Sequence, residues 1–556
     1  MNFVRIAGLL AALLLPGAAA AQTADLILIN GNIVTVDERQ PSAQAVAIAG
    51  ERILAVGSNE EIQRLRRGST RVIDLAGKTV VPGLVDGHLH FVGLGSARGT
   101  SLDLNDARSE AEVAAMVRRA AARAQAGEWI TGGDWHTGNW EREQWPSKAS
   151  LDQAAPNHPV LLSGMHGHAS WVNSRALEIA DITRSTPDPP GGKILRDDKG
   201  EPNGILIENA QALVRSRVPA SSRVPLTERI RQSVQLSLSF GFTGAHDIGT
   251  SLETVDAYKQ LINAGDFPFR INAVPRVWNA GPQLDEILAR GVIAGYGGNR
   301  LTMRGVKLSI DGALGARGAA LMAPYSDEPH NIGVIRVPYD QIYFILEKSL
   351  KAEFNAALHA IGDRGNQMAL DAVEEALRSN PVRDHRIRVE HAQIVRPQDL
   401  PRFAQLGIIA SVQWMHCTLD MPWAEKRVGD RVRSGYAWRT LLNHGTRLLG
   451  GSDEGARTFS PFMGIHAAVT RQDAKGWPAG GWYPEQRLTR MEALKSYTLD
   501  AAYASFEEDV LGSITPGKYA DMVVLSKDIM TIPAPEILET QAVMTIVAGK
   551  IAFERK

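Results

Sequence analysis

The chain has 556 residues, of which 44% are hydrophobic, and its formal net charge at pH 7 is -1. This length exceeds the size of one small domain and indicates a large catalytic domain with an appendage. The balanced charge excludes a protein that binds nucleic acid mainly through a basic surface.

The first 21 residues have the features of a signal peptide. Arg5 supplies a positive charge, residues 6–15 form a short apolar run, and alanines end the segment. The run is shorter than the ~20 apolar residues that span a bilayer. We therefore expect an exported, periplasmic protein with no stable membrane insertion after cleavage. The alternative is an uncleaved membrane anchor, which the Pro-Gly pair at residues 16–17 disfavours because it interrupts a helix.

Both ends of the mature chain are rich in predicted strands. Residues 25–36 indicate two strands joined as a hairpin at Asn30-Gly31, and residues 44–56 repeat this pattern around Gly50. Near the C-terminus, residues 542–553 indicate a further hairpin that turns at Gly549. We predict a small β-sandwich domain built from both termini, comprising residues 22–82 and 506–556.

The middle of the chain, residues 83–505, alternates apolar strand-like segments with helical segments. This alternation favours an α/β fold, and its length indicates a TIM-like (β/α)8 barrel, here with an insertion at about residues 96–215. In such a barrel the chemistry lies at the C-terminal ends of the strands. Polar residues at those strand ends are therefore the first candidates for the site.

His88 and His90 lie in residues 81–90 (VPGLVDGHLH), where an apolar strand reaches a loop. Side chains two residues apart on a strand point the same way, so the two imidazoles form a two-residue metal clamp. Four more residues of ligand type follow at later strand ends: Lys307, His359, His391 and Asp453. Neutral imidazole and carboxylate both suit zinc, and this set could hold one or two divalent ions. A lysine joins it only as a carbamate, because an ammonium group cannot bind a cation.

Five segments resemble the amidohydrolase superfamily, and the resemblance covers essentially the whole mature chain. They are residues 81–90, 306–315 (VKLSIDGALG), 358–363 (LHAIGD), 389–393 (VEHAQ) and 450–453 (GGSD). More narrowly, they are similar to the branch that contains N-substituted formamide deformylase, in amidohydrolase family 3.

The resemblance implies a role for each candidate ligand. His88 and His90 would bind a buried metal from strand 1, and carboxylated Lys307 on strand 4 would bridge two metals. His359 and His391 on strands 5 and 6 would bind the second metal, and Asp453 on strand 8 would contact the buried metal and transfer protons. In members with a single metal, an unmodified Lys307 could instead contact substrate. The resemblance also suggests a homodimer.

Three further residues are candidates for substrate contact. His168 precedes a Trp-Val-Asn segment that resembles the family, although the neighbouring residues depart from its pattern. Asp311 and Arg317 follow strand 4, where an arginine could hold a carboxylate or a carbonyl group.

The function that we expect is metal-dependent hydrolysis of a C–N bond in a small molecule, such as an N-acyl or N-formyl amine. Metal-activated water would attack the carbonyl carbon, with Asp453 as the catalytic acid and base. The same centre could serve an ester, a lactone or a cyclic amide, or deaminate a ring. An exported binding protein without turnover is a further alternative, which a missing metal ligand would favour.

Overall fold

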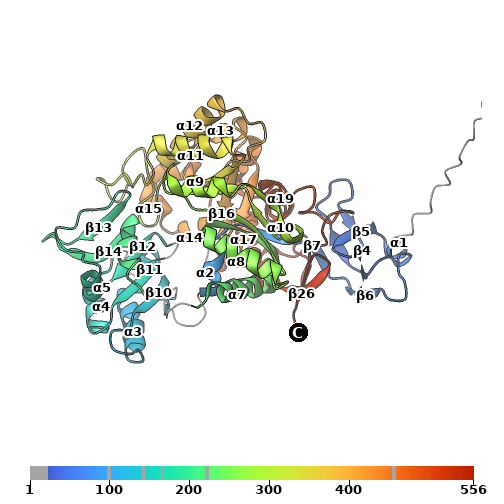
Figure 1. Ribbon diagram of the computed structural model, residues 1–556, viewed down its shortest axis with the longest axis horizontal. Coiled ribbons are helices and arrows are strands. Elements are labelled where there is room, and N and C mark those ends of the chain that lie inside the picture. Colours follow the sequence, from blue (N-terminus) through green and yellow to red (C-terminus); the bar gives the residue numbers. More distant parts are fainter. Residues whose placement is uncertain are drawn as a thin grey trace, which may run out of the picture.

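The structure is a computed structural model that describes residues 23–96, 102–104, 106–140, 144–164, 167–219, 224–453 and 459–556. The signal peptide expected at residues 1–21 lies outside the described residues. A central α/β body lies between an N-terminal β-rich unit and a separate sheet at the opposite end (Figure 1). No helix of the described residues is both long and apolar enough to cross a membrane.

The central body contains two five-stranded sheets whose long strands are mutually parallel. The first has the order β17-β18-β16-β15-β8, and the second has the order β19-β20-β21-β22-β23. The strands of the first sheet are β8 (Leu84–Leu89), β15 (Phe242–Thr250), β16 (Arg270–Pro275), β17 (Ile293–Gly295) and β18 (Leu301–Met303). Those of the second are β19 (Gly305–Ser309), β20 (Asn355–Ala360), β21 (Arg388–His391), β22 (Ile409–Gln413) and β23 (Leu448–Gly451).

The two sheets meet on two sides. On one side only Arg304 separates β18 from β19, and the backbone NH of Val277 donates to the carbonyl of Lys307 at 2.8 Å. On the other side the NH of Asp453 donates to the carbonyl of His88 at 2.8 Å. The result is a TIM-barrel-like α/β fold, in which the described strands form two sheets rather than one continuous hydrogen-bonded barrel.

Helices follow most of the parallel strands, as an α/β fold requires. They include α2 (Phe91–Ser96), α7 (Leu226–Ser239), α8 (Leu252–Asn263), α9 (Pro282–Ala289), α11 (Tyr339–Lys351), α12 (Asp363–Ser379), α13 (Leu400–Gln405), α14 (Trp414–Asp420), α16 (Trp438–Asn443), α17 (Pro461–Thr470), α18 (Arg490–Ser496) and α19 (Leu499–Ala504). On α12 the buried Ala369, Val373 and Ala376 recur at helical spacing, which gives this helix its apolar face.

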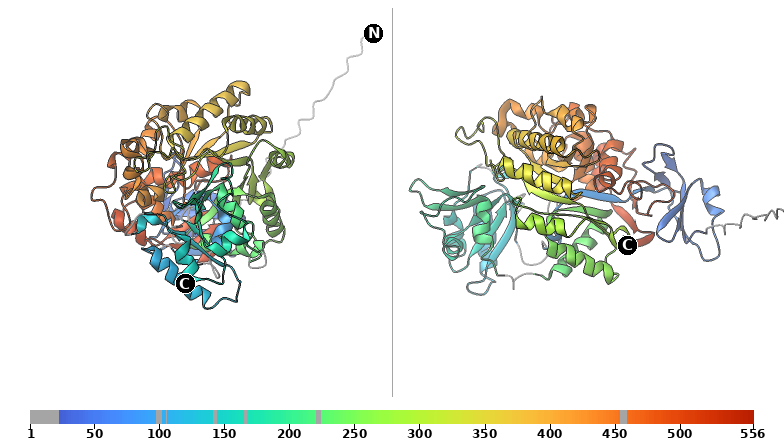
Figure 2. Two further views of the ribbon diagram at one scale, coloured as in Figure 1. Left: turned by 90° about the vertical axis from the view of Figure 1, so that its left-hand side faces the viewer. Right: turned by 45° about the horizontal axis from the view of Figure 1, so that its top comes forward.

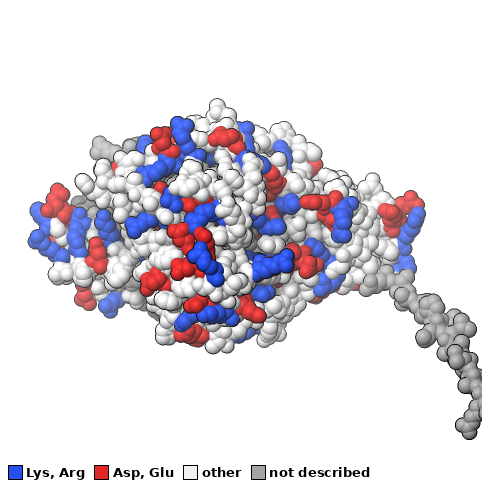
Figure 3. All heavy atoms as spheres, turned by 90° about the horizontal axis from the view of Figure 1, so that it is seen from above, with Lys and Arg blue, Asp and Glu red and all other residues white. Residues whose placement is uncertain are grey.

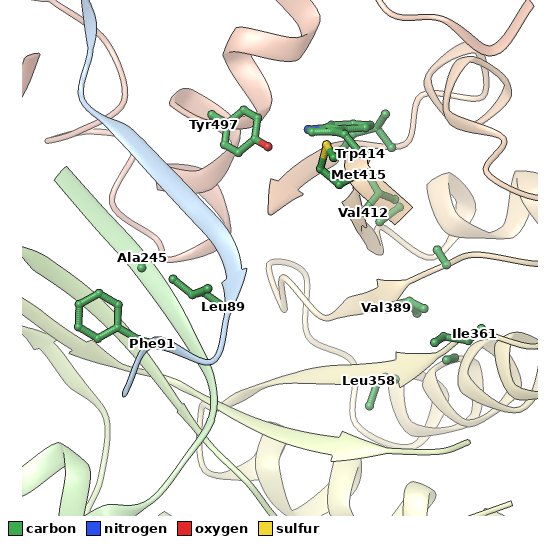
Figure 4. Close-up of a cluster of buried hydrophobic side chains, with 14 of the residues drawn as sticks. Leu89, Phe91, Ala245, Leu358, Ile361, Val389, Val412, Trp414, Met415 and Tyr497 are labelled. Atoms are coloured by element: carbon green, nitrogen blue, oxygen red, sulfur yellow. The ribbon is translucent and has the colours of Figure 1, made fainter. Parts of the chain in front are cut away.

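The main hydrophobic core lies between the strands and these helices. Figure 4 shows part of it, where Leu89, Ala245, Leu358 and Val389 contribute side chains from four strands. All four side chains are buried. Apolar packing therefore fixes the strands whose ends carry the polar candidates.

Two sheets are built from the chain ends. One contains β1 (Leu26–Ile29), β4 (Ala45–Ala49), β5 (Arg52–Gly57) and β6 (Arg71–Asp74). The other contains β2 (Asn32–Val34), β3 (Ser42–Ala43) and β7 (Thr79–Pro82) from the N-terminal part, with β24 (Met522–Leu525), β25 (Ala542–Val547) and β26 (Lys550–Glu554). Side chains of both sheets share one hydrophobic cluster. The sandwich arrangement stays a prediction.

The hairpins expected in these sheets have different outcomes. The pairs β4–β5 and β25–β26 are antiparallel, as the turns at Gly50 and Gly549 predict. The prediction of a hairpin at Asn30-Gly31 was wrong, because β1 pairs with β4 and β6 whereas β2 pairs with β3 and β7. This turn carries the chain from one sheet to the other. The local sequence is the same for such a connection as for a hairpin.

A six-stranded insertion sheet, with the order β13-β14-β12-β11-β10-β9, follows β8 in the chain. Its strands are β9 (Leu102–Asp103), β10 (Ile130–Trp135), β11 (Val160–Gly164), β12 (Ala169–Val172), β13 (Gly192–Arg196) and β14 (Pro202–Glu208). The segment also contains α3 (Glu110–Ala121), α4 (Lys148–Ala154), α5 (Ser174–Ile179) and α6 (Ala212–Arg215). It has hydrophobic clusters of its own and lies beside the α/β body (Figure 2).

Basic and acidic side chains of the described residues are intermingled on the face of the molecule seen from above (Figure 3). This pattern agrees with the formal net charge of -1.

Candidate metal centre

The central pocket, a cavity of about 850 Å³, contains all six candidate ligands in its wall. They are His88, His90, Lys307, His359, His391 and Asp453. His88, His359 and His391 lie in the C-terminal part of a parallel strand, and Lys307 lies in the middle of one. His90 and Asp453 follow β8 and β23 within two residues. The structure therefore brings together residues that are up to 365 positions apart, since the carboxyl ends of parallel strands lie at one side.

The closest grouping within this set is the His–His–Asp cluster of His88, His391 and Asp453. One ligand atom from each lies within 4.8 Å of the others. The distance from His88 Nε2 to Asp453 Oδ1 is 3.4 Å, and His90 Nε2 lies at the same distance from that oxygen. Two imidazoles and a carboxylate around one point are a donor set that zinc and similar divalent ions accept.

His391 occupies a position between the two expected metal sites. The resemblance assigned it to a second metal with His359, and their ring centroids are indeed 4.4 Å apart. Its ring is also 4.9 Å from that of His88. The side chain thus contacts ligands of both groups.

Burial keeps these imidazoles in the form that binds metals. The pKa values of His88, His359 and His391 lie well below the ordinary 6.5, first because burial disfavours the charged ring and second because cationic or histidine neighbours repel it. Nε2 of His88 and Nε2 of His359 are buried without a hydrogen-bond partner among the described residues. Buried polar atoms normally have partners, so these two nitrogens fit a bound cation.

Glu390 orients His88 from the neighbouring strand. Its Oε2 lies 2.5 Å from Nδ1 of His88, and its Oε1 lies 2.6 Å from Nε of Arg388. A carboxylate at Nδ1 holds the proton there and leaves Nε2 free to bind a metal. Similarly, Nδ1 of His391 donates to Oε1 of Gln413 at 2.7 Å.

Sequence reasoning missed Glu390, although its motif was recognised. Neighbouring residues of a strand normally point to opposite faces, so Glu390 and His391 could not both be expected at one site. His391 has a φ of 75°, which breaks the alternation. Both side chains consequently contact His88.

Asp453 reaches the cluster because β8 and β23 approach each other closely. A Cβ atom on Gly451 would lie 2.5 Å from the backbone nitrogen of His88, so only glycine fits there. Asp453 itself has a φ of 52°. Burial raises the pKa of its carboxyl group to about 7, and the cation of Lys307 opposes this rise.

Lys307 is buried in the wall of the pocket. Burial lowers the pKa of its ammonium group, against the opposing effect of the Glu390 carboxylate. No hydrogen bond or ion pair joins its Nζ to another described residue. A buried amine with a lowered pKa and no partner is suited to covalent modification or to binding a ligand.

The three candidate substrate contacts occupy three different surroundings. His168 lines the pocket, and its Nδ1 lies 2.8 Å from Oε1 of Glu208. Asp311 is buried next to His359, where it accepts hydrogen bonds from backbone NH groups that include those of Ile361 and Gly362. Arg317 is not among the residues that line this pocket.

Arg317 instead forms an ion pair with Asp327 at 2.9 Å. The turn at residues 313–318 places the arginine beside that carboxylate. A substrate contact by Arg317 stays a prediction. Sequence reasoning also missed residues that do line the pocket, from the insertion sheet and the α/β body: Glu208, Gln211, Arg215, Arg276, Trp278 and Arg336.

Known proteins show to which family the chain belongs. The model of the amidohydrolase family matches residues 71–553 of the chain. The chain belongs to the amidohydrolase family. This finding confirms the resemblance seen in the motifs.

Two relatives and one solved structure are similar to the chain over nearly its whole length. Protein LONG AFTER FAR-RED 3 of Arabidopsis thaliana is 35% identical, with 91% of this chain and 88% of that protein covered. N-substituted formamide deformylase of Arthrobacter pascens is 29% identical, with 96% and 99% covered. An uncharacterised metal-dependent hydrolase of Pyrococcus horikoshii OT3 is 27% identical, with a TM-score of 0.72 and 92% and 99% covered. The family and these neighbours make this protein a metal-dependent hydrolase of small molecules.

Proposed function

We propose that this protein hydrolyses an amide-type C–N bond and releases an amine and a carboxylic acid from an N-formyl or N-acyl amine. The observation that carries the proposal is the buried His–His–Asp cluster in the wall of the central pocket. The similarity to a relative named N-substituted formamide deformylase supports the choice of the C–N bond.

Zinc is the ion that we propose, held by His88, His90 and Asp453 with His391, because nitrogen and carboxylate ligands suit it. When bound, such an ion lowers the pKa of a coordinated water towards about 7 and polarises a carbonyl group. The neutral rings of His88 and His391 keep their lone pairs available for it over the whole physiological range of pH.

Asp453 moves the proton in this scheme. Its carboxylate accepts a proton from the attacking water as the new C–O bond forms at the acyl carbon. The resulting carboxylic acid then donates that proton to the leaving nitrogen as the C–N bond breaks. In the metal-free protein burial raises the pKa of this carboxyl group to about 7, and a bound cation would lower it.

Lys307 is proposed to carry a carbamate when the centre is complete. The neutral amine would attack carbon dioxide, form an N–C bond and release one proton, which converts the buried cation into an anion. Burial favours the neutral amine that this reaction needs, and Nζ has no hydrogen-bond partner among the described residues. His359 would then help to hold a second ion.

We also propose export to the periplasm, on the basis of residues 1–21. Cell fractionation and N-terminal sequencing of the mature protein test this point. Retention of the first residues in a cytoplasmic protein would contradict it.

A panel of N-formyl amines, N-acyl amines, esters and lactones tests the reaction. We expect amine release from the first two groups, and Asp453→Asn should lower kcat at least about a hundredfold because it removes the acid and base. Asp198→Asn is the matched control, since this aspartate is exposed. Faster turnover of esters or lactones than of every amide, or full activity of D453N, would contradict the proposal.

A further inference from the structure

Three arginines line the central pocket, and they differ in what their guanidinium groups contact. Arg336 forms an ion pair with Glu208 at 3.0 Å. Arg215 donates to the neutral oxygens of Gln211 and Ser163, at 2.8 and 3.1 Å. Only Arg336 is therefore neutralised by a carboxylate within the described residues.

Arg276 is the least satisfied of the three. It follows β16 directly and is partly buried. No acceptor or carboxylate is hydrogen-bonded to its guanidinium group among the described residues, and the carboxylates of Asp453 and Glu208 act on it only from a longer distance. Its Cζ lies 5.3 Å from the ring centroid of Trp278. A partly buried cation without a hydrogen-bonded counter-ion favours a ligand that supplies one.

The backbone directs Arg276 towards the candidate metal centre. Arg276 and Lys307 form a parallel β-bridge between β16 and β19. Residues that pair across adjacent strands project to the same face, and both side chains line the pocket. Gly249 leaves space for the guanidinium group, since a Cβ there would lie 2.6 Å from Nη2 of Arg276.

The charged side chains in the pocket wall favour the binding of an anion. The arginines are Arg215, Arg276 and Arg336, and the carboxylates are Glu208 and Asp453. Lys307 adds a cation as the free ammonium group and an anion as the proposed carbamate. Glu208 is occupied by His168 and Arg336, and Asp453 belongs to the His–His–Asp cluster. A bound divalent ion would make the pocket still more positive.

We propose that Arg276 binds a carboxylate of the substrate, so that the substrate is an N-formyl or N-acyl amino acid rather than a neutral amide. This inference rests on the proposed function and deepens it. The planar guanidinium group matches a carboxylate through two parallel hydrogen bonds, which a neutral carboxamide does not replace. The neighbouring Trp278, whose side chain is half exposed, would pack against the part of the substrate next to the carboxylate.

The first test compares N-formylphenylalanine with its carboxamide, which differs only in the charged group. Wild-type kcat/KM should be about tenfold to a hundredfold higher for the carboxylate. Arg276→Gln should remove this preference by lowering kcat/KM for the carboxylate alone, and Arg276→Lys should restore part of it. Arg290→Gln is the matched control, because Arg290 pairs with Asp256 at the surface. Equal loss on both substrates in R276Q, or a wild-type preference for the carboxamide, would overturn the proposal.

The second test measures binding without turnover, by titration calorimetry on the metal-free protein. N-acetylphenylalanine should bind more tightly than its carboxamide to the wild type, and R276Q should bind both alike. Tighter binding of a phosphonate analogue than of the carboxylate would overturn the assignment of the anion. If no substrate is hydrolysed, the proposed function fails, whereas calorimetry still decides whether Arg276 selects a carboxylate.

Discussion

Oε2 of Glu390 lies 2.5 Å from Nδ1 of His88, and both side chains are buried. The same carboxylate contacts Arg388 through its other oxygen. Glu390 thus connects a cation of the α/β body to the imidazole that begins the His–His–Asp cluster. It orients a candidate metal ligand without lining the pocket itself.

Replacing Glu390 should weaken metal binding. In Glu390→Gln the amide no longer holds the proton on Nδ1 of His88 by charge, so we expect metal affinity to fall about 10- to 100-fold. Competition with a chromophoric chelator measures this change. Glu286→Gln, at an exposed position of α9, is the control. Unchanged affinity in E390Q would show that Glu390 does not orient the ligand.

Gly451→Ala should disturb the contact between β8 and β23. The added Cβ would lie 2.5 Å from the nitrogen of His88, so one of the strands must move. We expect a loss of about 1–3 kcal/mol in the free energy of unfolding, with weaker metal binding. Chemical denaturation measures the first effect. The control is Gly133→Ala on β10, where a Cβ meets no atom within 4 Å. Equal stability of the two variants would contradict the close approach of β8 and β23.

Metal binding should strengthen as the pH rises through about 7. Burial raises the pKa of Asp453 to about 7, so below that pH the folded protein holds a proton that the metal must displace. In the metal-free protein the same raised pKa makes the folded state lose stability as the pH rises from the ordinary 3.8 towards 7, because the unfolded chain has already released its proton.

Thermal unfolding with and without zinc, at about pH 6 and about pH 8, checks this linkage. The increase in Tm caused by zinc should be larger at the higher pH. In Asp453→Asn the pH dependence of that increase should become weaker. A larger increase at the lower pH would contradict the assignment of Asp453 as a ligand.

A carbamate on Lys307 has a direct signature in mass. Intact-protein mass spectrometry under non-acidic conditions should detect the added mass of one carbon dioxide, and Lys307→Arg should lack it. Short carboxylic acids should restore part of the activity of Lys307→Ala, because they can supply the missing carboxylate. Full activity in K307A without any added acid would exclude a bridging role.

The six candidate ligands could be predicted, because each lies in an apolar strand-like segment or shortly after one. The fold could likewise be predicted as TIM-barrel-like from the alternation of strands and helices. What the sequence could not indicate depends on pairing between distant strands. Arg276 became a candidate only through its bridge to Lys307, and Glu390 only through the positive φ of His391.

A local pattern does not determine the partner of a strand or of a side chain. Asn30-Gly31 suits a hairpin, yet β1 and β2 enter different sheets. Arg317 follows strand 4 closely, yet Asp327, ten residues further on, pairs with it. In both cases the partner depends on tertiary packing, which a short segment of sequence does not determine.

The central claim is that a metal ion held by the His–His–Asp cluster is required for hydrolysis. Metal content by mass spectrometry and turnover of an N-formyl amino acid, measured on the same sample during stepwise chelation, test this most directly. We predict at least one divalent ion per chain, and activity that falls in proportion to metal loss and returns with zinc. His391→Ala should lose both the metal and the activity. Full activity in the metal-free protein would contradict the account.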